Sequence, residues 1–235
     1  GNPRRFSSDL VGEAQRKLLL TLWNTYSFFV TYANIDHFDP AAAPPAQRTE
    51  RDLWVRSALH RLIEEVTQQL DDYEPTAAAR AIEGFVDQLS NWYIRRSRRR
   101  FWKSDDAVAQ AAAYHTLHEC LTTLAKLIAP FTPYLAEEIH HNLAVNDEDS
   151  VHLAAWPETD KTLIDIDLNQ AMELVQRLAS LGRAARSKAG VKVRRPLPEV
   201  LVGVADIRQA VDEAGELRKL HGRKTILFID EVHRF

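Results

Sequence analysis

Apolar side chains recur every three or four positions along most of the chain, the pattern of amphipathic helices that bury one face. The pattern predicts helices over about 9–33, 50–73, 76–102 and 105–128, another that opens at 132–133, and a last one over 168–189. In the first of these the apolar face consists of Leu18, Leu19, Leu22, Trp23, Tyr26, Phe29, Val30 and Ala33. No internal repeat accompanies them.

The ends of these helices carry the residues that helix ends prefer. Thr49 with Asp52 three positions later is close to a capping box, and Pro133 suits a first helical position. Gly190 is a suitable stop for the last helix, and Trp156 is expected to pin the long polar loop 146–166. Amphipathic helices joined by short, proline-marked loops predict a mainly α fold, an antiparallel helix bundle.

One stretch, Asn91–Trp102, places five arginines in six positions with aromatic residues on both sides. The apolar spacing upstream makes it the C-terminal end of a helix, where the helix dipole favours cations. Like charges four residues apart repel each other by a few tenths of a kcal/mol, roughly. Two interpretations stay open. The arginines are solvated or paired with acids elsewhere, or a polyanion neutralises them beside the aromatic rings.

Charge is distributed unevenly, although the net charge is only −3. Two stretches, 91–104 and 183–195, each carry six basic side chains and no acid. Without those twelve, 18 of the 30 basic residues remain against 33 acidic ones. An acidic body with two basic clusters favours local, oriented binding of a polyanion. We call these stretches the first basic cluster (Arg95, Arg96, Arg98, Arg99, Arg100 and Lys103) and the second basic cluster (Arg183, Arg186, Lys188, Lys192, Arg194 and Arg195).

Other chemistry is poorly represented. A single cysteine, Cys120, excludes an internal disulfide and a multi-cysteine zinc site. His115 and His118 lie near Glu119 but lack a further ligand, so no metal site is predicted. There is no catalytic-triad signature, and no apolar run is long enough to span a membrane. A cytoplasmic location is expected.

Several segments resemble isoleucyl-tRNA synthetase, a class I enzyme, in order and at the spacing of that family. They are Leu18–Phe29, Asn91–Trp102, Ala129–Ile139, Ser150–Leu153 with Trp156-Pro157, and Ser180–Gly190. The resemblance covers about 1–200. It implies a helical anticodon-binding domain over 9–200 and isoleucine tRNA as the partner.

Single-stranded RNA loops are recognised through aromatic and arginine stacking and through phosphate contacts. With the resemblance, this makes the basic clusters and one tryptophan the candidate tRNA-binding residues: Arg95, Arg96, Arg98, Arg99, Arg100, Trp102, Lys103, Arg183, Arg186, Lys188, Lys192, Arg194 and Arg195.

The catalytic signatures of the family, His-Ile-Gly-His and Lys-Met-Ser-Lys-Ser, do not occur in this sequence. Residues 1–8 are interpreted as a severed linker from the catalytic core. The chain is therefore expected to be inactive alone, without a cofactor of its own, because ATP and Mg²⁺ serve the catalytic parts of the parent families. A catalytic core supplied separately is the expected protein partner.

From about 203 onward the synthetase resemblance stops. Residues 203–235 resemble the Walker B region of an AAA+ ATPase of the replication-associated recombination protein A type, which implies a short α/β tail. In that family the residues at the places of Asp230 and Glu231 order Mg²⁺ and position water. No P-loop accompanies them, so they are expected to be non-functional in a fused fragment. The alternative function is such an ATPase fragment joined to a helical protein-interaction module.

Overall fold

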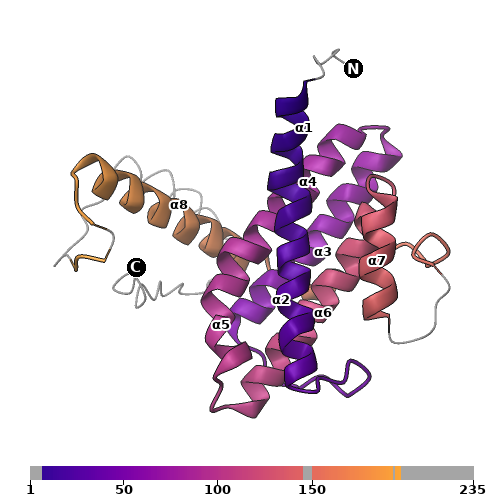
Figure 1. Cartoon of the computed structure of the whole chain (residues 1–235), viewed down its shortest axis with the longest axis horizontal. Coiled ribbons are helices and arrows are strands. Elements are labelled where there is room, and N and C mark those ends of the chain that lie inside the picture. Colours follow the sequence, from indigo (N-terminus) through magenta and orange to yellow (C-terminus); the bar gives the residue numbers. More distant parts are fainter. Residues whose placement is uncertain (1–6, 145–149, 193, 197–235) are drawn as a thin grey trace. The chain divides into compact units, whose positions relative to one another are not determined.

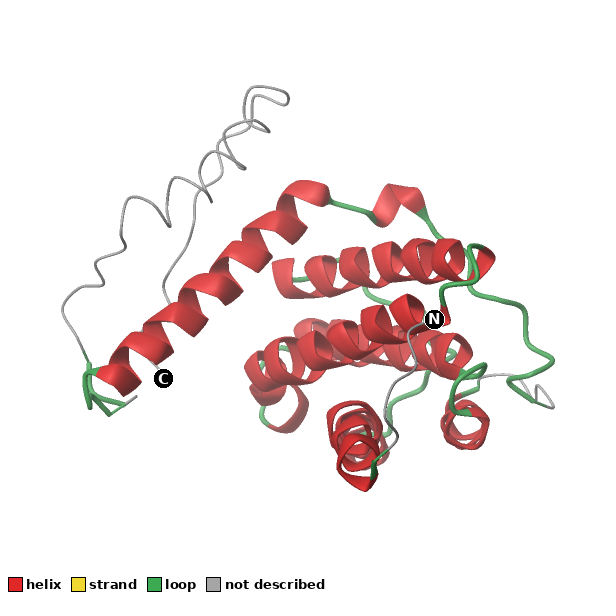
Figure 2. Ribbon diagram, turned by 90° about the horizontal axis from the view of Figure 1, so that it is seen from above, coloured by secondary structure: helices red, strands yellow, loops and turns green. Residues whose placement is uncertain are grey.

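The computed structural model describes residues 7–144, 150–192 and 194–196, and the chain divides into two compact units, Gly1–Ile164 and Asp165–Phe235. Each unit is described by itself. Helices account for the regular structure of the described residues (Figures 1 and 2). The prediction of a mainly α fold is confirmed.

The first unit opens with one continuous helical rod, made of α1 (Ser8–Ala14), the π-helical segment η1 (Gln15–Leu20) and α2 (Thr21–Ile35). The elements that follow are α3 (Glu50–Asp71), α4 (Pro75–Gln88), the π-helical segment η2 (Leu89–Ile94), α5 (Arg95–Trp102), α6 (Ala107–Ile128), α7 (Pro133–Leu143) and the short 3₁₀ helix η3 (Lys161–Leu163). Short connections make α3 and α4, and α6 and α7, antiparallel neighbours.

Helix starts agree with the sequence pattern to within a few residues. Thr49 and Asp52 form the predicted capping box of α3, with each side chain hydrogen-bonded to the other residue's backbone N–H. The carboxylate of Asp106 accepts from the N–H groups of Val108 and Ala109 at the start of α6. These local hydrogen bonds satisfy donors that a helix start leaves open.

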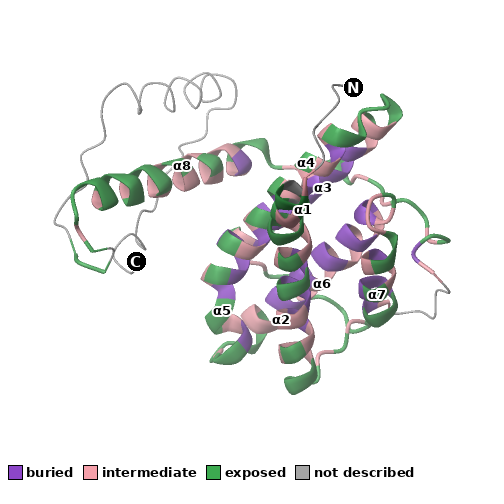
Figure 3. Cartoon of the chain, turned by 45° about the horizontal axis from the view of Figure 1, so that its top comes forward, coloured by how far each residue is buried: buried purple, intermediate pink, exposed green. Residues whose placement is uncertain are grey.

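The core of the first unit lies where the helices face one another, and their outer sides are exposed (Figure 3). Its largest fully buried side chains include Leu22, Leu59, Tyr93, Phe101 and Leu121. Of the face predicted for the first helix, Leu22, Tyr26 and Phe29 are buried, whereas Trp23 is 39% exposed.

The helix predicted over 76–102 contains the π-helical segment η2, which the periodicity did not indicate. An uninterrupted α-helix continuing inward from Leu89 would bring positions 96 and 100 closest to the core. A π-helical turn takes up an extra residue. The buried positions after it are Ser97 and Phe101 instead, so Arg98 and Arg99 between them are rotated outward.

The loop after α7 is fastened to α3 as expected. The Trp156 Nε1–H donates to Thr67 Oγ1 at 2.9 Å, and the Asp160 N–H donates to His60 Nδ1 at 3.1 Å. Lys161 Nζ lies 3.2 Å from a Glu64 carboxylate oxygen. Trp156 therefore pins the loop, although it remains 37% exposed.

The second unit contains α8 (Ile166–Lys188), which the carboxylate of Asp165 caps through the Leu168 N–H. The predicted stop is confirmed, since Gly190 has a φ of 64°. The Val191 N–H donates to the Arg186 carbonyl at 2.9 Å and the Gly190 N–H to the Ser187 carbonyl at 3.1 Å, which is a Schellman motif. The apolar positions predicted to face inward on α8 are only half-buried: Leu168, Met172, Val175 and Ala179.

The predicted helix and strand of the tail, including Asp230 and Glu231, lie outside the described residues. Among the residues that are described, no group of three His, Cys, Asp or Glu side chains is arranged to hold a metal ion. None of the helices in the described ranges is both long and apolar enough to cross a membrane.

Candidate nucleic-acid interface

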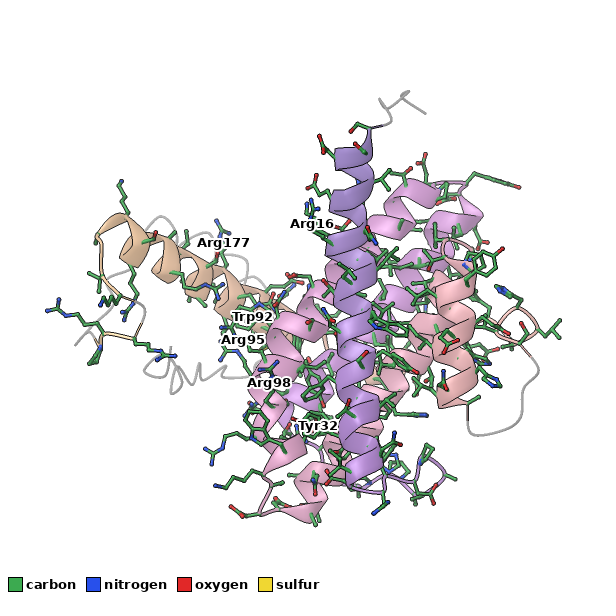
Figure 4. The ribbon with its side chains drawn as sticks, in the orientation of Figure 1. Arg16, Tyr32, Trp92, Arg95, Arg98 and Arg177 are labelled. Atoms are coloured by element: carbon green, nitrogen blue, oxygen red, sulfur yellow. The ribbon has the colours of Figure 1, made fainter. Side chains whose placement is uncertain are left out.

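Helix α5 divides the first basic cluster into an outward and an inward set. Arg95, Arg98, Arg99 and Lys103 are exposed, and Trp102 at the end of the helix is 56% exposed. Figure 4 shows Arg95 and Arg98 on α5 beside α2, which carries Tyr32. The outward set is therefore open to a partner.

Arg100 points the other way and is held inside the domain. Its Nη1 and Nη2 each donate to one carboxylate oxygen of Asp52 at 2.8 Å, a bidentate pair. Nε and Nη2 also donate to the Ala109 carbonyl, at 3.1 and 2.7 Å. The Tyr93 hydroxyl donates to the same Asp52 carboxylate at 2.7 Å. Of the two interpretations of the arginine run, Arg100 therefore follows the first: it pairs with an acid elsewhere in the chain, Asp52.

The electrostatics of this pair follow from burial and hydrogen bonding. Burial would raise the pKa of Asp52, whose side chain is fully buried, but hydrogen bonds from Arg100, Tyr93 and Thr49 hold that pKa below its ordinary value. Burial opposes the charge of Arg100 as well, yet its hydrogen bonds to Asp52 raise the pKa of its guanidinium. Burial also raises the pKa of Tyr93 well above its ordinary value, which is consistent with a protonated hydroxyl that donates to Asp52.

Aromatic rings support two of the remaining arginines. The Arg96 guanidinium carbon lies 4.5 Å from the centroid of the Trp92 ring, and that of Arg98 lies 5.9 Å from the Phe28 ring. Both are within the range of cation–π attraction. Phe28 in turn packs edge-on against Phe101, with centroids 5.3 Å apart. Arg96 and Arg98 are thus each supported by an aromatic ring, and the ring under Arg98 is itself packed against the core residue Phe101.

Three contributors to this face were missed from the sequence. Phe28 and Tyr32 lie one turn apart on α2, with ring centroids 4.9 Å apart. Phe28 stands within a segment that matched the synthetase pattern, but it lies off the apolar stripe. Arg51 of α3 donates to the Arg96 carbonyl at 2.7 Å and so ties α5 to α3. The sequence did not indicate Arg51, because it is a single basic residue between Glu50 and Asp52 and belongs to neither basic cluster.

The second basic cluster lies on the end of α8 and the turn after it. Arg183, Lys188, Lys192, Arg194 and Arg195 are exposed. Arg186 is half-buried, and its Nη1 donates to the carbonyl oxygens of Lys192 at 3.3 Å and Arg195 at 2.7 Å. Residues 183–195 include no aromatic residue. This cluster therefore offers charge on a hydrogen-bonded turn without a ring of its own.

Comparison with known proteins gives the family. The family model described as the anticodon-binding domain of tRNA ligase matches residues 52–201. An isoleucine–tRNA ligase of Dehalococcoides mccartyi (strain CBDB1) is 54% identical over 207 residues, 86% of this chain and 20% of that protein. One of Thermus thermophilus is 52% identical over 235 residues, 97% of this chain and 22% of that protein. One of Bacillus thuringiensis (strain Al Hakam) is 47% identical over 201 residues, which are 86% of this chain and 19% of that protein.

The chain spans about a fifth of the length of these curated relatives. The Thermus thermophilus alignment leaves out only about 3% of the chain and thus enters the predicted tail 203–235. The boundary near 203 and the ATPase-like fragment stay predictions. Since the family model covers well over half of its residues, the chain belongs to the anticodon-binding domains of tRNA ligases.

Proposed function

We propose that this chain is the part of an isoleucine–tRNA ligase that holds isoleucine tRNA by its anticodon arm. The observation that carries the proposal is the outward face of α5, where exposed cations lie beside two arginines, Arg96 and Arg98, that contact aromatic rings. The choice of isoleucine tRNA rests on relatives named isoleucine–tRNA ligase, at 54 and 52% identity.

The candidate residues take different roles in this proposal. Arg95, Arg98, Arg99 and Lys103 neutralise phosphates or stack on bases, and Trp102 offers its exposed ring. Arg96 adds charge from above Trp92, at 4.5 Å. Arg100 contributes only indirectly, because its guanidinium is hydrogen-bonded to Asp52 and Ala109.

The second basic cluster supplies further phosphate contacts through five exposed cations: Arg183, Lys188, Lys192, Arg194 and Arg195. Arg186 acts by fixing the turn that carries the last three of these. The acidic remainder of the chain repels RNA, so the two clusters together set the orientation of the bound tRNA.

The attachment of isoleucine, with its ATP and Mg²⁺, belongs in this proposal to the catalytic core of the parent enzyme, in the cytoplasm. The isolated chain should show no isoleucine-dependent pyrophosphate exchange and no ATP hydrolysis above background. Activity that is lost on Glu231→Gln would instead favour the ATPase-like alternative for the tail.

The test is the salt dependence of binding, measured by fluorescence anisotropy with isoleucine tRNA and with an unrelated tRNA. Replacing Arg95, Arg98, Arg99 and Lys103 by Ala should weaken binding at every salt concentration and reduce the salt slope by about 0.7–0.9 for each phosphate that is no longer neutralised. The matched control keeps the charges through three Arg→Lys changes and Lys103→Arg, and should retain the slope. Equal binding by wild type and the alanine variant would refute the proposal.

A further inference from the structure

The Arg98 side chain differs from the other exposed cations in what lies under it. Its guanidinium carbon is 5.9 Å from the Phe28 ring centroid, and the residue itself is exposed. Among the described residues no carboxylate pairs with it. An arginine over an aromatic ring that lacks an acid partner keeps its charge and its planar face available to a ligand.

The ring beneath Arg98 is held firmly in place. Phe28 packs edge-on against Phe101, which is 1% exposed, and Phe101 packs edge-on against Tyr114 with centroids 5.0 Å apart. Aromatic pairs in this geometry are favourable beyond the area they bury. Phe28 is therefore held in place by the core, and it positions the planar guanidinium of Arg98 above it.

Tyr32 adds a polar group beside this plane. Its ring lies one helical turn from Phe28 on α2, and it is half-buried. Within the described residues its hydroxyl has no hydrogen-bond partner, whereas the hydroxyl of the neighbouring Tyr114 donates to Asp36. The Tyr32 hydroxyl is thus able to donate to or accept from the edge of a stacked ring.

The neighbouring arginine–aromatic pair lacks these features. Arg96 lies over Trp92, but Trp92 is only 9% exposed and Arg96 is half-buried. Arg95 and Arg99 are exposed, yet neither has a ring contact among the described residues. Among the arginines of this helix, Arg98 alone combines an exposed guanidinium with a supporting aromatic ring, and a flat ligand with a polar edge fits there.

We propose that Arg98, Phe28 and Tyr32 form a stacking site for one unpaired base of the bound RNA, with the base on the Arg98 guanidinium and its edge at the Tyr32 hydroxyl. The inference rests on the proposed function, since it takes RNA as the ligand. It goes further by assigning one base to one site. Stacking tolerates any base, whereas the hydroxyl provides a preference for one edge.

The test uses the full chain and a hairpin copy of the isoleucine tRNA anticodon arm, with 2-aminopurine placed at each loop position in turn. One position should be quenched on binding to the wild type. Arg98→Lys keeps the charge but removes the plane, so quenching should be lost and affinity reduced about 5- to 160-fold, as expected for the loss of one stacked base. The salt slope should not change, since the charge remains.

Two further variants separate this role from a structural one. Arg80→Lys, on an exposed arginine of α4 outside both basic clusters, should bind and quench as wild type does. Tyr32→Phe should keep the quenching but lessen the preference among bases at the quenched position. Thermal unfolding should be unchanged in both, because neither removes a buried contact.

Wild-type quenching and affinity in Arg98→Lys would overturn the stacking site and leave the proposed function standing, provided that the salt slope is still present. A quenched base whose signal survives Arg98→Lys but is lost in Arg80→Lys would also overturn it. Absence of any RNA binding by the wild type would overturn both proposals.

Discussion

The two basic clusters look alike as sequence but differ as structures. Each has six cations and no acid, and each uses one arginine to hold its own scaffold. Arg100 does so through the buried side chain of Asp52, whereas Arg186 does so through the carbonyl oxygens of Lys192 and Arg195. A run of cations therefore does not by itself say which members face a partner.

The difference also separates what each cluster can recognise. Two cations of α5, Arg96 and Arg98, lie over Trp92 and Phe28 on a closely packed bundle, which suits unpaired bases. Those of 183–195 lie on a helix end and a turn without aromatic residues, which suits phosphates. We expect loop recognition from the first basic cluster and sequence-independent attraction from the second.

The largest effect is expected at the scaffold of the first basic cluster. Arg100→Ala leaves the buried Asp52 carboxylate without its bidentate partner, and removal of such a partner costs about 3–5 kcal/mol. The loss in the free energy of unfolding is measured by urea denaturation followed by far-UV circular dichroism. Arg99→Ala, one residue away and exposed, should stay within about 0.5 kcal/mol of wild type. Similar free energies of unfolding for the two variants would show that the two arginines are equivalent.

Neutralising the exposed cations of each cluster should come next in size. Either set of alanine substitutions should lower tRNA affinity and flatten the salt slope, by about 0.7–0.9 for each phosphate left without its cation. Only the variant of the first basic cluster should lose the preference for the anticodon arm over a hairpin of equal length with an unrelated loop. Loss of that preference in the variant of the second cluster would break the comparison.

The scaffolds of the two clusters should also differ in their response to low pH, because Arg100 pairs with a carboxylate and Arg186 with backbone carbonyl oxygens. The pKa of Asp52 is lower in the folded than in the unfolded chain, so its contribution is fully present above roughly pH 4 and is lost as pH falls through the folded pKa below that value. The stability of Asp52→Asn should therefore depend less on pH than that of wild type below about pH 4. Glu119, whose pKa is lowered against burial by His60 and Arg56, acts in the same direction and keeps part of the slope. An unchanged slope in Asp52→Asn would contradict the assignment.

The smallest effects are expected at the turn of the second basic cluster. Gly190→Ala places a side chain at a φ of 64° and should destabilise the end of α8 by about 1–2 kcal/mol. Gly182→Ala is the matched control. It lies inside α8 with no atom near its added methyl, and alanine should stabilise that position by roughly 0.5–1 kcal/mol. Hydrogen exchange at the Val191 amide tests both expectations: it should be faster than wild type in Gly190→Ala and not in Gly182→Ala.

The fold was predictable because its determinants are local. Apolar periodicity, the Thr49–Asp52 capping box, Pro133 and Gly190 all act within a few residues, and the helices begin and end close to the expected positions. The π-helical segment η2 was not predictable, because an i→i+5 turn leaves no clear mark in the apolar pattern.

The candidate site was predictable only in outline. The first basic cluster was visible as charge, but the partner of Arg100 was hidden in Asp52, 48 residues away and already accounted for by its capping role. Phe28 and Tyr32 were missed because α2 meets α5 only in the folded chain. Long-range pairing determines which cations remain exposed, and a single sequence does not contain that information in local form.

The most direct test of the central claim, that the outward face of α5 holds the anticodon loop, is photocrosslinking. Isoleucine tRNA carrying 4-thiouridine in the anticodon loop would be irradiated with the full chain, and the crosslinked peptides identified by mass spectrometry. We predict crosslinks to the peptides that contain Arg98 and Tyr32, and their disappearance in high salt. Crosslinks confined to residues 183–195, with none on α5 or α2, would contradict it.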